Sequence, residues 1–147
     1  MTRAAAALAL SASLALSACG QSAEQRFRTH ELRPLRTQLE QRRQQFAALV
    51  GAAHPGRRRD ARALTHAVDA LATVSGRIAA LRPPGSVRLD FERYASANRR
   101  LVSVLREFAI GVAERDRTRM SSASAGATRA AGEVRRAEDA LDQALTG

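Results

Sequence analysis

The chain has 147 residues, of which 24 are basic and 14 acidic, and it carries a net charge of +10. Its length allows one small domain and excludes two separate hydrophobic cores. Aromatic residues make up only 3% and tryptophan is absent, so a core must be built mainly from leucine, valine and alanine. Every basic residue is arginine, which together with the many alanines is typical of a GC-rich genome.

The N-terminal residues have the three parts of a secretory signal. Arg3 is followed by an apolar run over residues 4–16, and small residues then lead to Cys19, the only cysteine. The apolar run is too short to span a membrane, because a span needs about 20 strongly apolar residues. A single cysteine in an exported chain indicates a free thiol, an intermolecular bond or a modified sulfur.

The sequence Leu16-Ser17-Ala18-Cys19 resembles the lipobox of bacterial lipoproteins. The resemblance implies cleavage between Ala18 and Cys19 and a diacylglyceryl group, carrying fatty acyl chains such as palmitate, on the Cys19 sulfur. It places the protein at the extracytoplasmic face of the cell membrane. An ordinary signal peptide with a chance cysteine is the alternative. The expected organisation is a signal peptide of residues 1–18, a lipidated tether of residues 19–26 and a helical domain of residues 27–147.

A first helix is predicted after the tether. Ser22 and Gln25 have the spacing of a capping box, which indicates that the helix begins there. Pro34 should kink this helix or mark its start, because proline has no N–H to donate. Arg42 occupies a position where the pattern expects an apolar residue, and its aliphatic stem should cover the edge of the core. The apolar stripe is Leu32, Leu35, Leu39, Phe46 and Leu49.

A break over residues 51–56 separates this helix from a second one. The second stripe is Leu64, Val68, Leu71, Val74 or Ser75, Ile78 and Leu81. The sequence Arg82-Pro83-Pro84-Gly85 is the strongest turn signal in the chain. Ser86 is expected to cap the helix that follows.

The third stripe contains one polar residue, Asn98. It could fix the register of the helices, or it could lie at a solvent-facing edge, which we favour. Asp116 is expected to cap a fourth helix. The third stripe is Phe91, Tyr94, Asn98, Leu101, Leu105, Phe108 and Val112, and the fourth is Ala123, Ala127, Ala130, Val134, Ala137, Leu141 and Leu145.

No segment alternates apolar and polar residues with the period of a strand. Four helical stripes joined by short connections predict an all-α fold, an antiparallel up-down-up-down four-helix bundle after a cleaved signal peptide.

Motifs for catalysis or metal binding are not found in the sequence. The histidines, His30, His54 and His66, do not form the Glu-x-x-His pairs of bundle metal sites. There is no Gly-x-Ser-x-Gly elbow and no glycine-rich phosphate loop. We therefore expect no enzyme, metal or cofactor.

An exported all-helical enzyme is the alternative. The segment from Arg33-Pro34-Leu35-Arg36 to Arg42-Arg43 resembles the first helix of secreted chorismate mutases. That family also uses a lysine, which this chain lacks. An enzyme requires convergent polar groups, for which the candidates are Arg36, Glu40, Arg43, His66 and Asp69.

The arginine clusters define a candidate basic patch, formed by Arg42, Arg43, Arg57, Arg58 and Arg59. Such a patch could face anionic lipid headgroups or wall polymers, or the arginines could be solvated helix faces balanced by acids. Nucleic acid is not expected, because the chain is exported and aromatic residues do not alternate with the basic pairs.

The function expected from these features is that of a lipid-anchored, non-catalytic binding module of the bacterial envelope. Its partners would be the membrane, through the anchor, and an envelope protein, anionic lipid or wall polymer. The other candidate is a carrier that holds a small apolar ligand inside the bundle.

Overall fold

The computed structural model describes residues 22–146, so the predicted signal peptide, the cleavage site at Ala18 and Cys19, and the first tether residues lie outside the described part. The described chain is helical and has no strand. Its elements are α1 (Ala23–Arg26), the π-helical segment η1 (Phe27–Leu32), α2 (Arg33–Ala52), α3 (Arg58–Ala79), the 3-10 turn η2 (Gly85–Val87), α4 (Arg88–Glu114) and α5 (Arg117–Ala144). Because α1, η1 and α2 are continuous, the predicted all-α four-helix bundle is confirmed.

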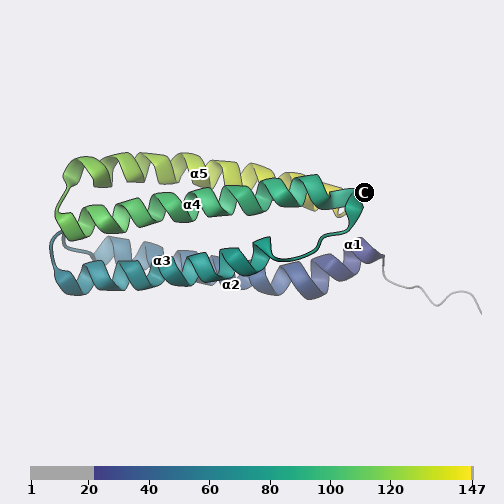
Figure 1. The fold of residues 1–147 in the computed structure, drawn as a ribbon, viewed down its shortest axis with the longest axis horizontal. Helices are drawn as coiled ribbons and strands as arrows, with labels where there is room; N and C mark the ends of the chain where they lie inside the picture. The colour runs from purple at the N-terminus through teal and green to yellow at the C-terminus, as the bar shows by residue number, and fades with distance from the viewer. Residues whose placement is uncertain (1–21, 147) are drawn as a thin grey trace, which may run out of the picture.

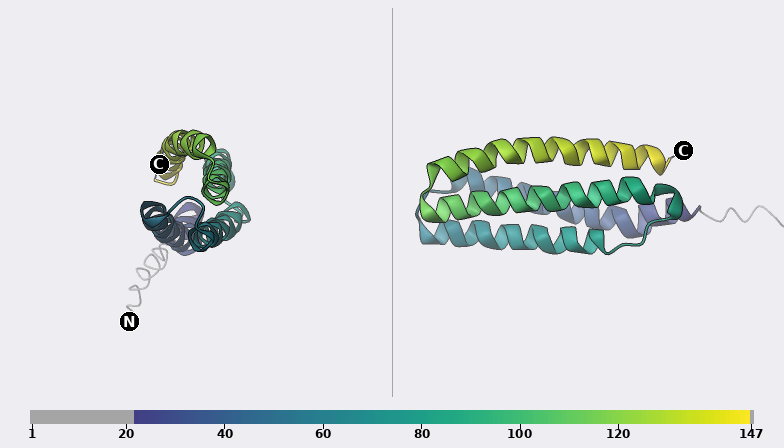
Figure 2. Two further views of the ribbon diagram at one scale, coloured as in Figure 1. Left: turned by 90° about the vertical axis from the view of Figure 1, so that its left-hand side faces the viewer. Right: turned by 45° about the horizontal axis from the view of Figure 1, so that its top comes forward.

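Helices that follow each other in the sequence run antiparallel and lie side by side (Figure 1, Figure 2). The pair α4 and α5 packs most extensively, followed by α3 with α4 and α2 with α3. The backbones of α2 and α5 make few close contacts, so the bundle is least tightly packed along this side. The start of α1, the turn between α3 and α4 and the end of α5 all lie at one end of the bundle (Figure 1).

The predicted apolar stripes form a single core. In α3, the stripe residues from Leu64 to Ile78 are buried, Ser75 included. In α4, Phe91, Tyr94 and Leu101 are buried, and Leu105 and Phe108 are partly buried at its edge. Aromatic pairs at each end of the core, Phe27 with Phe91 and Phe46 with Phe108, meet edge to face. Burial of these side chains is the main source of stability.

Small residues allow α4 and α5 to approach closely. A Cβ atom on Gly111 would lie 2.8 Å from Cγ of Met120 and 3.1 Å from its backbone nitrogen. A Cβ atom on Gly126 would lie 3.1 Å from Cγ1 of Val104. The buried residues of α5 are Ala123, Ala130, Val134 and Leu141.

The first helix begins earlier than the predicted tether ends. The hydroxyl of Ser22 accepts a 3.1 Å hydrogen bond from the backbone nitrogen of Gln25, so the predicted cap is confirmed. Residues 23–26 are helical and continue into η1, within the stretch expected to form the tether.

A π-helical turn accommodates Pro34. Proline cannot donate to the carbonyl four residues before it, and its ring crowds that carbonyl. The chain widens in the preceding turn, where the N–H of Arg33 donates to the carbonyl of Arg28, five residues back. Phe27 and Leu32 are consequently both buried although they are five positions apart in the sequence. Pro34 alters the helix by a π turn, and it does not mark the start of the helix, which begins at Ala23.

Two local predictions at helix starts have different outcomes. Asp116 caps α5 as predicted, since its Oδ1 accepts a 2.9 Å hydrogen bond from the nitrogen of Arg119. The prediction for Ser86 is wrong, because Val87 is the residue at the start of α4. The Ser86 hydroxyl instead donates a 2.7 Å hydrogen bond to Glu24, which lowers the pKa of that carboxyl and joins η2 to α1.

Within the described chain, no helix combines the length and the apolar character that crossing a membrane requires.

Candidate functional site

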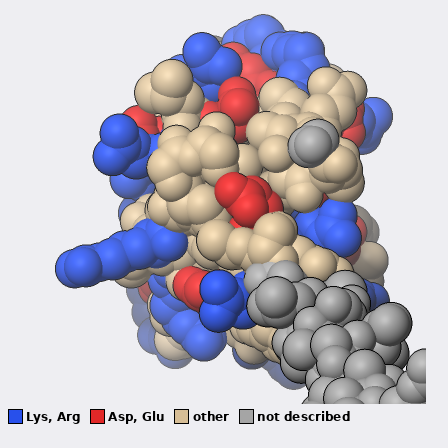
Figure 3. Space-filling view, turned by 90° about the vertical axis from the view of Figure 1, so that its right-hand side faces the viewer, with Lys and Arg blue, Asp and Glu red and all other residues tan. Residues whose placement is uncertain are grey.

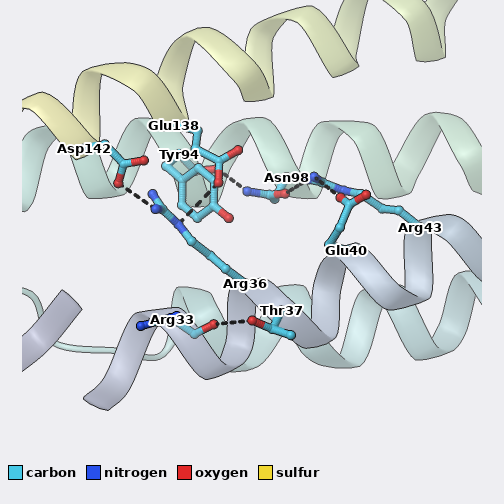
Figure 4. Close-up of polar contacts among 9 residues, drawn as sticks. All are labelled: Arg33, Arg36, Thr37, Glu40, Arg43, Tyr94, Asn98, Glu138 and Asp142. Atoms are coloured by element: carbon cyan, nitrogen blue, oxygen red, sulfur yellow. Dashed lines mark hydrogen bonds and ion pairs between the residues drawn. The ribbon is translucent and has the colours of Figure 1, made fainter. Parts of the chain in front are cut away.

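Arg36 joins α2 to α4 and α5 on the less tightly packed side of the bundle, between α2 and α5, which we call the open side (Figure 4). Its Nη1 donates a 2.6 Å hydrogen bond to Oδ1 of Asp142 on α5, and its Nε lies 3.5 Å from Oε1 of Glu138. Its guanidinium carbon lies 4.9 Å from the centre of the Tyr94 ring on α4. A cation held over an aromatic face and paired with carboxylates is fixed in position.

The environment of Arg36 keeps it charged. Burial alone would lower the pKa of Arg36, but the hydrogen bond to Asp142 and the charges around it outweigh burial and raise that pKa. Burial, with the negative charge of Glu138, raises the pKa of Tyr94. The site therefore holds a permanent cation against a neutral phenol at physiological pH.

A second polar cluster lies two helical turns along α2. Nη2 of Arg43 donates a 2.5 Å hydrogen bond to Oδ1 of Asn98, and Nη1 lies 3.6 Å from Oε2 of Glu40. The Nδ2 group of Asn98 donates a 2.9 Å hydrogen bond to the Tyr94 carbonyl. Asn98 is only 1% exposed, so its expected place at a solvent-facing edge is wrong. Both the oxygen and the nitrogen of its side-chain amide are hydrogen-bonded inside the bundle.

These two clusters line a groove between α2 and α5. Its main part has a volume of about 430 Å³ and is walled by Arg36, Glu40 and Arg43 of α2, Tyr94 of α4 and Glu138 of α5. A smaller extension of about 220 Å³ reaches Leu101, Val134 and Arg135. The groove therefore contains positive charges from Arg36 and Arg43 and negative charges from Glu40 and Glu138. Hydrogen bonds and ion pairs hold most of these side chains in position.

The predicted basic patch does not form one surface. Arg43 turns into the groove and is partly buried, whereas Arg42 is exposed and donates a 2.9 Å hydrogen bond to Gln45. The remaining members, Arg57, Arg58 and Arg59, are exposed at the start of α3. The patch divides because adjacent helical residues point in different directions.

The candidate enzyme residues separate into two groups. Arg36, Glu40 and Arg43 line the groove together. His66 and Asp69 are exposed on α3, and Oδ1 of Asp69 lies 3.1 Å from Nη2 of Arg106. The described residues contain no group of three or more side chains placed to hold a metal ion.

Three groove residues were missed in the sequence. Tyr94 was assigned only to the core, and Glu138 and Asp142 were not singled out. One signal was available, because Glu138 and Asp142 are four residues apart and so share a helical face. Their arginine partner lies about a hundred residues earlier, on a helix that no local pattern pairs with α5.

Comparison with protein-family models, with curated proteins and with solved structures finds no match to this chain.

Proposed function

We propose that this chain is a lipid-anchored protein of the bacterial envelope whose helical body binds a partner without catalysing a reaction. The groove between α2 and α5 is the proposed binding surface. The observation that carries this proposal is the clamp of Arg36 by Asp142, Glu138 and Tyr94, which holds charged groups in place along the open side of the bundle.

The anchor rests on the lipobox sequence that ends at Cys19. Ser22, the first residue of the bundle, follows Cys19 by three positions in the sequence, so the chain between them reaches at most about 11 Å. Two acyl chains give stable attachment where one is marginal, because each buried methylene contributes about 0.8 kcal/mol. The anchor would therefore hold one end of the bundle close to the bilayer, on the extracytoplasmic face of the cell membrane. Arginine side chains, interspersed with acidic ones, surround this end (Figure 3).

Binding is supported by the way in which the groove charges are paired. Arg36 is held by Asp142 and Arg43 by Asn98, so each cation is fixed by a hydrogen bond before a partner arrives. Fixed side chains lose little conformational entropy on association. Alternating positive and negative groups suit a protein segment with complementary charges, and we propose an envelope protein as the partner.

The close packing of α4 against α5 argues against a carrier of a small apolar ligand. Such a carrier requires space lined by leucine, valine and phenylalanine inside the bundle. The groove and its extension are open at the surface and bordered by charged side chains of α2 and α5. Gly111 and Gly126 bring α4 and α5 into contact.

Site-specific crosslinking in the native envelope tests the binding surface. A photoreactive residue replaces Gln44 in the groove wall, and a matched one replaces the exposed Thr73 on α3. We expect a discrete adduct from position 44 that is absent from position 73 and is lost with Arg36→Ala. Identical adducts from both positions would refute the groove as the binding surface.

A further inference from the structure

The π turn before Pro34 brings together two arginines that an α-helix would separate. Arg28 and Arg33 are five residues apart, and the N–H of Arg33 donates to the carbonyl of Arg28. A five-residue step passes only slightly beyond one turn of a π-helix, whereas in an α-helix it passes well beyond a turn. Arg33 and Arg36 then share a face through the ordinary three-residue step.

A pocket lies beside these residues. It has a volume of about 470 Å³ and is lined by Arg28, Thr29, Arg33, Arg36 and Asp142. It is separate from the main part of the groove and adjoins it at Arg36, which borders both. Three guanidinium groups and the Asp142 carboxylate line the pocket, and Glu138 lies against Arg36, so positive charge still exceeds negative charge there.

The charges of this pocket are unequally compensated. Arg36 is paired with Asp142 and Glu138, which fixes its position. Arg28 and Arg33 form no ion pair with any residue in the described part of the chain. The Thr29 hydroxyl donates a 2.7 Å hydrogen bond to the carbonyl of Gln25, so its proton is already used within the helix.

We propose that Arg28 and Arg33, beside the fixed charge of Arg36, bind the phosphate group of an anionic ligand in this pocket. Guanidinium groups match phosphate oxygens with paired hydrogen bonds, and the excess of positive charge attracts the anionic phosphate of a monoester, which carries about −1.5 to −2 at pH 7, or of a singly charged diester. The pocket has room for an organic group attached to the phosphate. π turns within α-helices frequently occur at functional sites.

Two sources can supply this chemistry, a soluble phosphate ester and a phospholipid headgroup. The pocket lies near the beginning of the first helix, which follows Cys19 closely in the sequence. The proposal does not depend on lipid attachment at Cys19, because the three arginines belong to the helical body.

Isothermal titration calorimetry on the full chain tests the proposal. The probes are inorganic phosphate, sn-glycerol 3-phosphate and dihexanoylphosphatidylglycerol kept below its micelle concentration, with dihexanoylphosphatidylcholine as the zwitterionic control. Tyr94 is the only tyrosine and tryptophan is absent, so its fluorescence reports on the neighbouring Arg36 independently. Tighter binding of glycerol 3-phosphate supports a soluble ester, and tighter binding of phosphatidylglycerol supports a headgroup.

The variant Arg28→Gln with Arg33→Gln should weaken binding of the phosphate probes by about tenfold or more, since hydrogen bonds to charged groups contribute about 1.5–3 kcal/mol. The matched control is Arg58→Gln with Arg59→Gln, which removes the same charge from exposed positions on α3 and should change binding by less than about twofold. Circular dichroism checks that both variants are folded. If a double variant is not folded, its two single variants are measured instead. Absence of binding by all three phosphate probes, or equal losses in the two double variants, would overturn the proposal.

Discussion

Arg43 on α2 and Asn98 on α4 are joined by a hydrogen bond of 2.5 Å, although Asn98 is 1% exposed and lies within a stripe of apolar residues. The same amide donates to the carbonyl of Tyr94. One buried polar residue thus sets the position of α2 along α4, because any shift along the helix would leave both groups without partners.

The substitution Asn98→Leu should destabilise the protein by about 1–3 kcal/mol, because it leaves Arg43 without its acceptor. Adding Arg43→Met should recover part of this loss, since both polar partners are then replaced together. Urea denaturation followed by circular dichroism measures both. The exposed Arg42→Met is the control and should lie within about 0.5 kcal/mol of the wild type. A double variant less stable than Asn98→Leu would contradict this account of the pair.

Arg36 and Asp142 should be energetically coupled. A double-mutant cycle with Arg36→Met and Asp142→Asn should give a coupling of about 1 kcal/mol, which is modest because the Asp142 side chain is 49% exposed. Arg36→Lys should keep only part of this coupling energy, because lysine lacks the planar group that lies over Tyr94 and pairs with two carboxylates. Coupling indistinguishable from zero would show that the clamp does not hold α2 to α5.

Ionisation of Tyr94 should limit stability at alkaline pH. Its pKa is raised in the folded state by burial and by Glu138, so the unfolded chain releases this proton first. The stability gained from the neutral phenol is fully present below the ordinary tyrosine pKa of about 10 and is lost as pH rises through the folded pKa. Because Tyr94 is the only tyrosine, tyrosinate absorbance follows it directly.

Tyr94→Phe removes that titration and should flatten the fall in stability above about pH 10. Thermal unfolding across the alkaline range compares the two proteins. An unchanged pH dependence in Tyr94→Phe would assign the alkaline loss to other groups.

Two glycines should respond oppositely to alanine. A Cβ atom on Gly76 would have no neighbouring atom within 4 Å, so Gly76→Ala in α3 should stabilise the protein by up to about 1 kcal/mol. Gly111→Ala should destabilise it, because the new methyl would lie 3.1 Å from the backbone nitrogen of Met120 and separate α4 from α5. Thermal melts of the two variants measure the difference, and shifts of the same sign would be inconsistent with the close approach of these helices.

Cys19→Ser tests the anchor separately from the groove. We expect the wild-type protein in the membrane fraction with the intact mass of an acylated chain beginning at Cys19. The variant should lose the modification and accumulate as uncleaved precursor or soluble protein. An unmodified wild-type thiol at Cys19 would refute lipid attachment without affecting the phosphate pocket.

Local structure could be predicted from the order of the residues alone. Hydrophobic periodicity identified the four long helices, and short polar residues predicted the caps at Ser22 and Asp116, because these features depend on residues within a few positions of one another. The same local rules predict a lipobox before the helical domain, in residues outside the described part of the chain. The prediction for Asn98 was wrong because periodicity gives a face of a helix but not the partner that faces it.

The groove and the pocket, in contrast, arise from the way in which the helices pack. Arg36 and Asp142 are 106 residues apart in the sequence. Whether they come into contact depends on how all four helices are arranged. The π turn changes the periodicity on which the helical pattern relies, so Phe27 joined the core and Arg28 joined Arg33 at positions that a step of 3.6 residues does not connect. Long-range packing and this local change in helical geometry are therefore the two physical reasons why the candidate sites were not visible in the sequence.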